Sequence, residues 1–193
     1  MLLLLASFQA AWAQTKPPST PVPPVALRSS ESLTALAPAE LMAYGNQWTY
    51  KGRGSLRFFG FKAYDATLWM AGADKQFSFT RPFALEIRYD TAVKGKDISN
   101  TSLIELQRIS QSSPEQITAW ASLMDSIFVD VQRGDQLIGL HLPGVGVKFL
   151  LNGKPAGESP DLAFSEAFFK IWLDPKTKRP DLRVALLGAN TDK

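Results

Sequence analysis

Residues 52–69 read GRGSLRFFGFKAYDATLW, a run of apolar and aromatic residues interrupted by glycines. Just upstream, Trp48 and Tyr50 are two positions apart and therefore share one face of an extended strand. Gly60 lies in the middle of the run, and glycine marks turns between strands because it adopts positive φ without steric cost. Residues 47–70 are thus predicted to form two strands joined by a tight turn.

The middle of the chain predicts one more strand and then two helices. Apolar side chains at every second position over residues 83–89 indicate a half-buried strand. Residues 98–109 show approximate helical spacing of apolar side chains. Ser113 followed by Pro114 is typical of a helix start, with a capping residue and a proline in the first turn.

The C-terminal part adds strands and closes with helices. Residues 136–142 and 145–151 are predicted strands, and Asn152-Gly153 is a pair that type I′ hairpin turns favour. A short edge strand at residues 154–157 can hold Pro155, because an edge strand does not need every N–H group. Helices are expected over residues 160–173 and 180–187. This order of strands and helices predicts one α+β domain.

The N-terminus has the features of a secretory signal. Residues 1–13 read MLLLLASFQAAWA, a short apolar run followed by small residues and a cleavage site after Ala13. A membrane-spanning helix needs about 20 apolar residues, so this segment is too short for stable membrane insertion. Residues 1–13 are therefore predicted to be a signal peptide, and the mature protein is predicted to be periplasmic or secreted.

Residues 14–45 are predicted to form a proline-rich linker and a short helix. Residues 17–24 contain five prolines, a composition that favours an extended and solvated chain. The short helix is expected within residues 33–42. The folded domain is then predicted to cover residues 46–190.

Composition and charge exclude several classes of function. The chain has 193 residues, with 21 basic and 18 acidic side chains, and no basic run that could follow a nucleic-acid backbone. It has no cysteine and a single histidine, His141, so thiolate chemistry and a histidine-based zinc site are excluded. No metal, cofactor or catalytic residue is predicted, and His141 is expected to be structural.

Four polar residues stand within the aromatic strand pair: Arg53, Arg57, Lys62 and Tyr64. An arginine and a tyrosine at the edge of an apolar cavity would suit a ligand with an acidic or carbonyl end and a hydrophobic body. Alternatively, these side chains point to solvent from a sheet that is buried on one face only. The bend at Gly60 leaves open whether Arg57 and Tyr64 share a face.

Several segments together resemble one known family. Residues 52–69, 82–89, 102–109, 167–175 and 182–188 are similar to chalcone isomerase-like proteins, and in particular to their exported bacterial branch. The resemblance implies an open-faced sandwich in which an antiparallel sheet is packed by helices. It also implies a ligand cleft between the sheet and the helices.

The plant enzymes of this family close a chalcone into a flavanone, and the resemblance argues against that reaction here. With Gly95 aligned to the family glycine, their tyrosine, lysine and asparagine positions fall on Ile98, Thr101 and Glu105. Their threonine position falls near Ala63. Ring closure needs an oriented nucleophile and a polarised carbonyl group. Because the polar groups that would provide both are missing, we do not expect this reaction.

Other relatives are non-catalytic and bind fatty acids through an arginine and a tyrosine. The resemblance therefore implies Arg57, with Arg53 as the second candidate, and Tyr64 as ligand-binding residues. We expect an exported protein that binds a small amphipathic ligand such as a fatty acid. Two alternatives remain at this point: an isomerase acting on an unsaturated carbonyl compound, and an accessory domain that binds other proteins.

The signal peptide gives the first testable prediction. Export should remove 13 of the 193 residues and leave Gln14 at the N-terminus. N-terminal sequencing of the protein from the extracytoplasmic fraction measures this directly. Recovery of the chain with an intact Met1 from the cytoplasm alone would contradict it.

Overall fold

The computed structural model describes residues 36–58 and 60–188. The predicted signal peptide, residues 1–13, and the proline-rich segment that follows it lie outside the described residues, as does Phe59.

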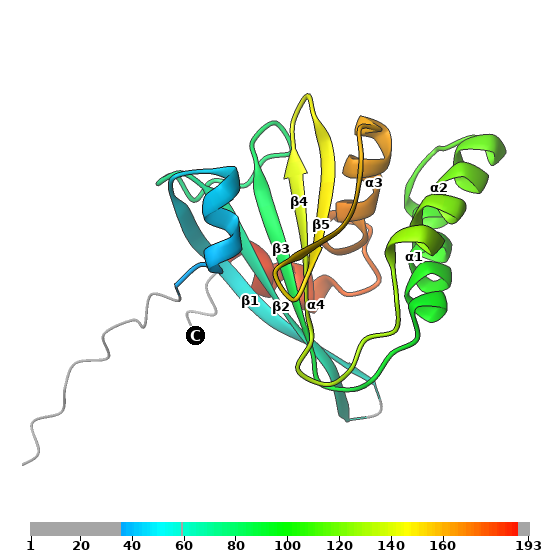
Figure 1. Cartoon of the computed structure of the whole chain (residues 1–193), viewed down its shortest axis with the longest axis horizontal. Coiled ribbons are helices and arrows are strands. Elements are labelled where there is room, and N and C mark those ends of the chain that lie inside the picture. The colour runs from blue at the N-terminus through cyan, green and yellow to red at the C-terminus, as the bar shows by residue number, and fades with distance from the viewer. Residues whose placement is uncertain (1–35, 59, 189–193) are drawn as a thin grey trace, which may run out of the picture. The chain divides into compact units, whose positions relative to one another are not determined.

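A six-stranded antiparallel sheet forms the centre of the domain, with its strands in sequence order (Figure 1). Every strand predicted from the sequence is present, and the α+β fold is confirmed. The strands are β1 (Trp48–Phe58), β2 (Phe61–Ala71), β3 (Phe83–Tyr89), β4 (Gln136–Leu142), β5 (Gly146–Leu151) and β6 (Lys154–Ser159).

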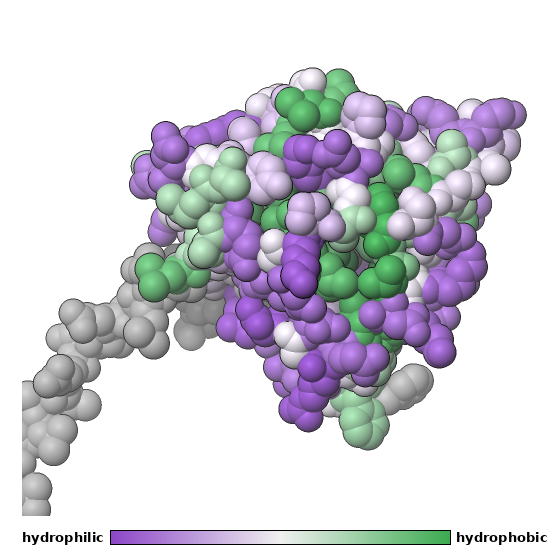
Figure 2. Space-filling view, in the orientation of Figure 1, coloured by the Kyte–Doolittle hydropathy of each residue, from purple (hydrophilic) through white to green (hydrophobic). Residues whose placement is uncertain are grey.

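Within the described residues four α-helices accompany the sheet: α1 (Gly95–Ile109), α2 (Pro114–Ile127), α3 (Leu162–Leu173) and α4 (Pro180–Leu187). Helix α4 packs on β1 and α3 packs on β4 to β6, whereas α1 packs on α2 and α3 (Figure 1). Along the residues that the structure describes, no helix has the length and apolar character needed to cross a membrane. In the view of Figure 1 the surface is largely hydrophilic, with hydrophobic residues showing beside α1 and α2 (Figure 2).

Two local signals in the sequence are confirmed at the level of hydrogen bonds and dihedral angles. Ser113 caps α2 in a reciprocal capping box, in which its side chain accepts from the Gln116 N–H and the Gln116 side chain accepts from the Ser113 N–H. Asn152 and Gly153 both have positive φ, 50° and 77°, as a type I′ turn requires.

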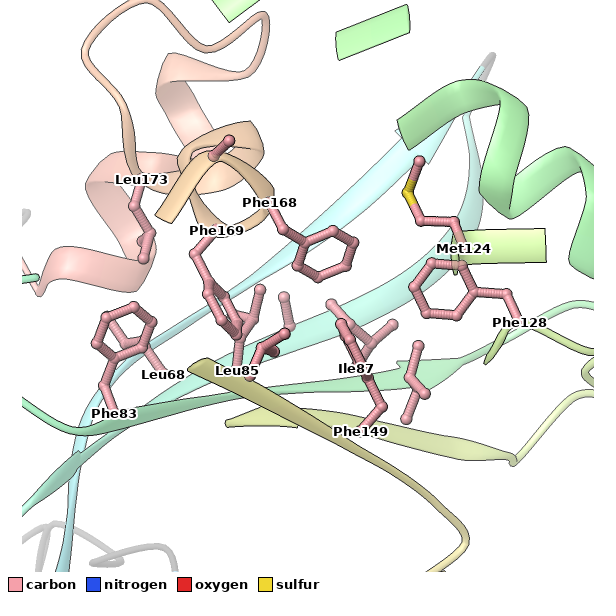
Figure 3. Packing of buried hydrophobic residues seen from close by; sticks show 14 of the residues in the cluster. Leu68, Phe83, Leu85, Ile87, Met124, Phe128, Phe149, Phe168, Phe169 and Leu173 are labelled. Carbon is pink, nitrogen blue, oxygen red and sulfur yellow. The ribbon is translucent and has the colours of Figure 1, made fainter. Parts of the chain in front are cut away.

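The main core lies between the sheet and the helices and is rich in phenylalanine. Phe83 and Phe149 from the sheet meet Phe168 and Phe169 from α3 (Figure 3). Gly52 in β1 allows α4 to approach, since a Cβ atom there would lie 2.2 Å from the Ala185 carbonyl oxygen. The sheet and helices are therefore packed backbone against backbone at α4 and aromatic against aromatic at α3.

The opposite face of the sheet is partly covered by the 3₁₀-helix η1 (Ala39–Tyr44). Leu41 is fully buried there, and its carbonyl oxygen accepts a 2.7 Å hydrogen bond from Trp48 Nε1. Leu41 and Trp48 form a second hydrophobic cluster with Trp69, Ile138 and other residues of the sheet. The packed unit thus begins N-terminal to residue 46, and the short helix expected within residues 33–42 is a 3₁₀-helix at Ala39–Tyr44.

Replacement of Leu41 tests whether η1 contributes to the fold. Leu41→Ala should lower the free energy of unfolding by about 2–4 kcal/mol, because it removes a fully buried side chain and leaves a cavity. Met42→Ala is the matched control, since Met42 is 54% exposed and should change stability by less than about 0.5 kcal/mol. Chemical denaturation of both variants measures the difference, and equal effects would show that η1 is not part of the core.

Candidate ligand-binding site

A cavity of about 240 Å³ lies between the inner face of the sheet and helices α1 and α3. Its walls are mainly apolar, and strands β1 to β5 all contribute side chains to them. The lining residues are Leu56, Phe58, Ala63, Tyr64, Leu85, Ile87, Tyr89, Val93, Asp97, Ile98, Thr101, Ser102, Glu105, Leu137, Gly139, Phe149, Phe168, Phe169, Ile171 and Trp172.

The cavity exists because α1 forms one of its walls without packing closely on the sheet. At the start of α1, a Cβ atom on Gly95 would lie 2.2 Å from the Phe128 carbonyl oxygen, and the Gly95 N–H donates to Asp130 Oδ1 at 2.9 Å. At the end of α1, Arg108 donates to the Lys176 carbonyl oxygen at 2.7 Å. These contacts fix both ends of the helix and leave the space beneath its middle unfilled.

Tyr64 supplies the most defined polar group in the cavity. Its hydroxyl oxygen accepts a 2.9 Å hydrogen bond from Trp172 Nε1. Burial raises the pKa of Tyr64 to about 12, and the hydrogen bond from Trp172 and the charge of Arg179 offset only part of this effect. The hydroxyl is therefore protonated at neutral pH and can donate its own proton to a ligand oxygen.

Tyr89 lies beside Tyr64, with the two rings edge to face at a centroid distance of 6.2 Å. Burial raises the pKa of Tyr89 above its ordinary value, and the neighbouring Tyr64 adds to this. Both phenols that line the cavity are thus neutral hydrogen-bonding groups at physiological pH.

Arg57, the predicted partner of Tyr64, lies on the other face of the sheet. Its neighbours Leu56 and Phe58 line the cavity, whereas the exposed Arg57 guanidinium donates to the Gly60 carbonyl oxygen at 3.2 Å. The structure therefore brings Tyr64 to the cavity and does not bring Arg57 to it. Arg57 and Tyr64 therefore lie on opposite faces of the sheet, a point that the bend at Gly60 left open in the sequence.

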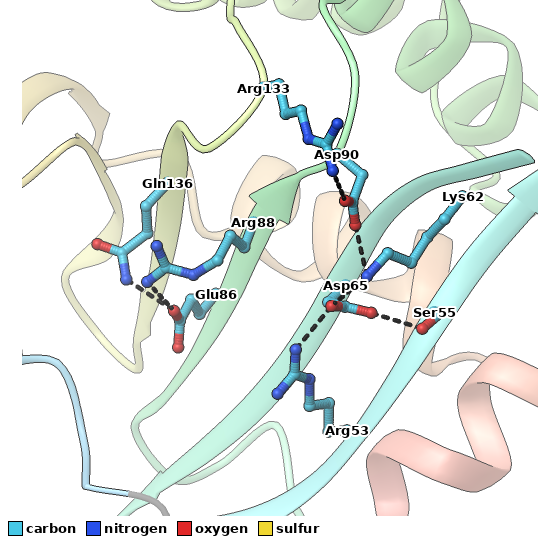
Figure 4. A network of polar contacts seen from close by, with 9 residues as sticks. All are labelled: Arg53, Ser55, Lys62, Asp65, Glu86, Arg88, Asp90, Arg133 and Gln136. Atoms are coloured by element: carbon cyan, nitrogen blue, oxygen red, sulfur yellow. Dashed lines mark hydrogen bonds and ion pairs between the residues drawn. The ribbon is translucent and has the colours of Figure 1, made fainter. Parts of the chain in front are cut away.

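The other two polar residues singled out in the strand pair belong to a network on that outer face (Figure 4). Asp65 accepts from Arg53 at 2.6 Å and from Lys62 at 2.9 Å, and Ser55 also donates to it. Burial alone would raise the pKa of Asp65, but these hydrogen bonds hold it at about 2. Arg53 and Ser55 thus link β1 to β2 through Asp65, whereas Lys62 contacts Asp65 within β2. Of the four polar residues only Tyr64 lines the cavity.

The positions carried over from the plant enzymes do line the cavity: Ala63, Ile98, Thr101 and Glu105. Glu105 is bound by Arg108 and Lys178, each at 2.6 Å. Burial tends to raise the Glu105 pKa, but the hydrogen bonds from Lys178 and Arg108 lower it below its ordinary value. Glu105 is therefore an anion whose charge is balanced by two cations.

His141 has a structural environment, as expected. Its Nδ1 lies 2.8 Å from the Ser165 hydroxyl oxygen, and its Nε2 lies 2.8 Å from the Phe79 carbonyl oxygen. The ring stacks on Phe83 at a centroid distance of 4.8 Å, and Ser165 is fully buried. A hydroxyl in this position cannot reach a substrate, so the pair holds α3 against β4.

Sequence reasoning missed the contribution of α3. Trp172 orients the Tyr64 hydroxyl, and Phe168 and Phe169 form part of the cavity wall. The signal was the spacing of Phe164, Phe168 and Trp172, which places three aromatic rings on one stripe of the helix.

The protein is of the α+β class, with an antiparallel sheet and an apolar cavity beneath its helices. Comparison with known proteins gives its family. The sequence model described as chalcone isomerase-like matches residues 34–188, so the chain belongs to the chalcone isomerase-like family. No curated protein matches the sequence significantly.

Among solved structures, the fold is similar to the crystal structure of a fatty-acid-binding protein from Arabidopsis thaliana. The TM-score is 0.58, and the match covers 75% of this chain and 89% of the plant protein. The two sequences are 10% identical, so the likeness is one of fold.

The raised pKa of Tyr64 can be measured. In the unfolded chain a tyrosine titrates near pH 10, so the folded state retains the Tyr64 proton between about pH 10 and 12. The resulting stabilisation is complete below pH 10 and is lost as the pH rises to 12. Difference absorbance between wild type and Tyr64→Phe should therefore show one phenol titrating at about pH 12, and a midpoint near pH 10 would contradict its burial.

Proposed function

We propose that this protein binds a small amphipathic ligand, such as a fatty acid, in the cavity beneath α1. We further propose that it does so outside the cytoplasm, as one of the exported bacterial members of the family. The observation that carries the proposal is an apolar cavity in which a protonated tyrosine hydroxyl has its oxygen already oriented by Trp172. Such a combination suits a hydrophobic body that ends in one polar group.

The ligand chain would lie against the apolar wall formed by Ile87, Phe149 and Phe168. Its carbonyl or carboxyl oxygen would accept the hydrogen bond from Tyr64. Glu105 does not repel an acidic end group strongly, because Arg108 and Lys178 balance its charge. The favourable free energy of binding would come mainly from burial of the ligand's hydrocarbon chain, at about 0.8 kcal/mol per methylene.

The similar plant structure is described as a fatty-acid-binding protein, and its fold supports this choice of ligand over others. Cyclisation of a chalcone is not part of the proposal. Ile98 and Ala63 present only aliphatic groups at two positions where the plant enzymes use hydroxyl groups.

Filling the cavity gives the sharpest test. Ile98→Trp places a bulky ring inside the cavity wall and should weaken binding of a saturated fatty acid by at least about tenfold, or 1.4 kcal/mol. Ile104→Trp is the matched control, because Ile104 is on the same helix but 57% exposed, and it should keep the wild-type affinity. Isothermal titration calorimetry measures both variants, and a wild type that binds no fatty acid would refute this ligand.

Tyr64→Phe refines the test by removing only the hydroxyl group. A neutral hydrogen bond contributes about 0.5–1.5 kcal/mol, so the affinity should fall by about two- to tenfold. Arg57→Ala should keep the wild-type affinity, because its side chain lies on the opposite face of the sheet. A large loss in Arg57→Ala would show that the ligand is bound elsewhere than in this cavity.

A further inference from the structure

The turn between β1 and β2 carries two exposed phenylalanines. Phe58 is 58% exposed and Phe61 is 81% exposed. Within residues 36–58 and 60–188, no other phenylalanine, tyrosine or tryptophan is classed as exposed. The end of β1 and the start of β2 lie at the lower end of the view in Figure 1, where hydrophobic atoms stand out beside hydrophilic ones (Figure 2). Large apolar side chains grouped at one projecting point indicate a contact surface.

Cationic side chains surround these two rings. Arg57 is exposed, and the nearby Arg133 side chain is 80% exposed. Lys62 also belongs to this end of the sheet, where it pairs with Asp90 at 2.5 Å, while Arg133 lies 3.8 Å from the same carboxylate. Two of the three cations, Lys62 and Arg133, thus share the Asp90 charge, and Lys62 also contacts Asp65. Aromatic rings flanked by arginine and lysine match the chemistry of an anionic lipid surface.

The turn is continuous with the ligand cavity. An outer groove of about 490 Å³ is lined by Phe58, Phe61, Ala63 and Arg133, among others. Phe58 and Ala63 also line the cavity beneath α1. One phenylalanine side chain and one methyl group therefore form the boundary between the groove at the turn and the candidate site.

We propose that the β1–β2 turn docks this protein on an anionic lipid bilayer, with Phe61 and Phe58 inserted among the lipids and Arg57 and Arg133 at the head groups. An amphipathic ligand then passes between the bilayer and the cavity along Phe58 and Ala63. The docking stands on the exposed rings and cations alone, and the passage of a ligand rests on the proposed function.

Vesicle binding of the full chain tests the docking. The probe is a vesicle made of phosphatidylcholine and phosphatidylglycerol in equal parts, and co-sedimentation gives the affinity. Phe61→Ser should reduce the affinity at least about tenfold, because the bilayer then loses contact with a ring that is 81% exposed. Val145→Ser is the control, since Val145 is 57% exposed at the β4–β5 turn, at the other end of the sheet, and should leave the affinity unchanged.

The head-group contact has its own variant. Arg57→Gln combined with Arg133→Gln should abolish the preference for these vesicles over vesicles of phosphatidylcholine alone. Vesicle binding by Phe61→Ser equal to that of wild type would overturn the proposal. So would size-exclusion chromatography that shows wild type dimeric and Phe61→Ser monomeric, since the rings would then contact a second copy of the chain.

Failure of the docking and failure of the proposed function are distinguishable. Phe61 does not line the ligand cavity, so Phe61→Ser should bind a fatty acid in solution as wild type does. If the protein binds a fatty acid but its vesicle binding does not depend on Phe61, only the docking proposal is refuted. If vesicle binding depends on Phe61 but the protein does not bind a fatty acid, the proposed ligand is refuted and the docking proposal is supported.

Discussion

The contact between α3 and the sheet is the interaction on which the rest of the structure depends. The Phe169 ring lies 4.9 Å from that of Phe83, and the Phe168 ring lies 5.1 Å from that of Phe149. These aromatic contacts set the distance between helix and strands, and one turn beyond Phe168 they place Trp172 beside Tyr64. Helix α1 packs on α3, so the wall of the cavity is also positioned by this contact. The contact between α3 and the sheet therefore determines both the packing of the core and the position of the Tyr64 hydroxyl.

The sequence predicted the fold well because its signals are local. Period-two alternation identified β3, although that strand is buried on both faces except at Arg88 rather than half-buried. Ser113 followed by Pro114 identified the start of α2, and Asn152-Gly153 identified a turn with two positive φ values. The start of the packed unit was harder to predict, because Leu41 is buried only through its contact with Trp48 and residues of distant strands. A proline-rich segment before it also obscured the boundary.

The site was predictable only in part, and the reason lies in strand register and chain separation. The pairing of β1 with β2 shifts at two places, between Tyr50 and Gly52 and between Leu56 and Arg57, so alternation cannot be counted through the pair. As a result Tyr64 lines the cavity while Arg57 lies on the other face, and the ligand-binding role expected of Tyr64 stays a prediction. Trp172 is 108 positions from Tyr64, and no sequence pattern within either segment predicts their hydrogen bond. Ala63, Ile98, Thr101 and Glu105 were found only because the family resemblance located them.

The sheet keeps its own charged side chains Arg53, Lys62 and Asp65 on the outer face, and this bears on how a ligand would be held. Arg53, Lys62 and Asp65 satisfy one another on the outer face, so no strand arginine has to be desolvated beneath α1. The cavity instead offers a neutral phenol, whose hydrogen bond is weaker than that of a guanidinium with a carboxylate. Affinity differences between related complexes arise mainly in the dissociation rate, so a neutral donor favours faster release. Rapid exchange suits a protein that takes up and gives back a ligand, whereas an enzyme must hold charge that develops during a reaction. In the proposed function, a neutral Tyr64 donor in place of an arginine would therefore favour exchange of the ligand.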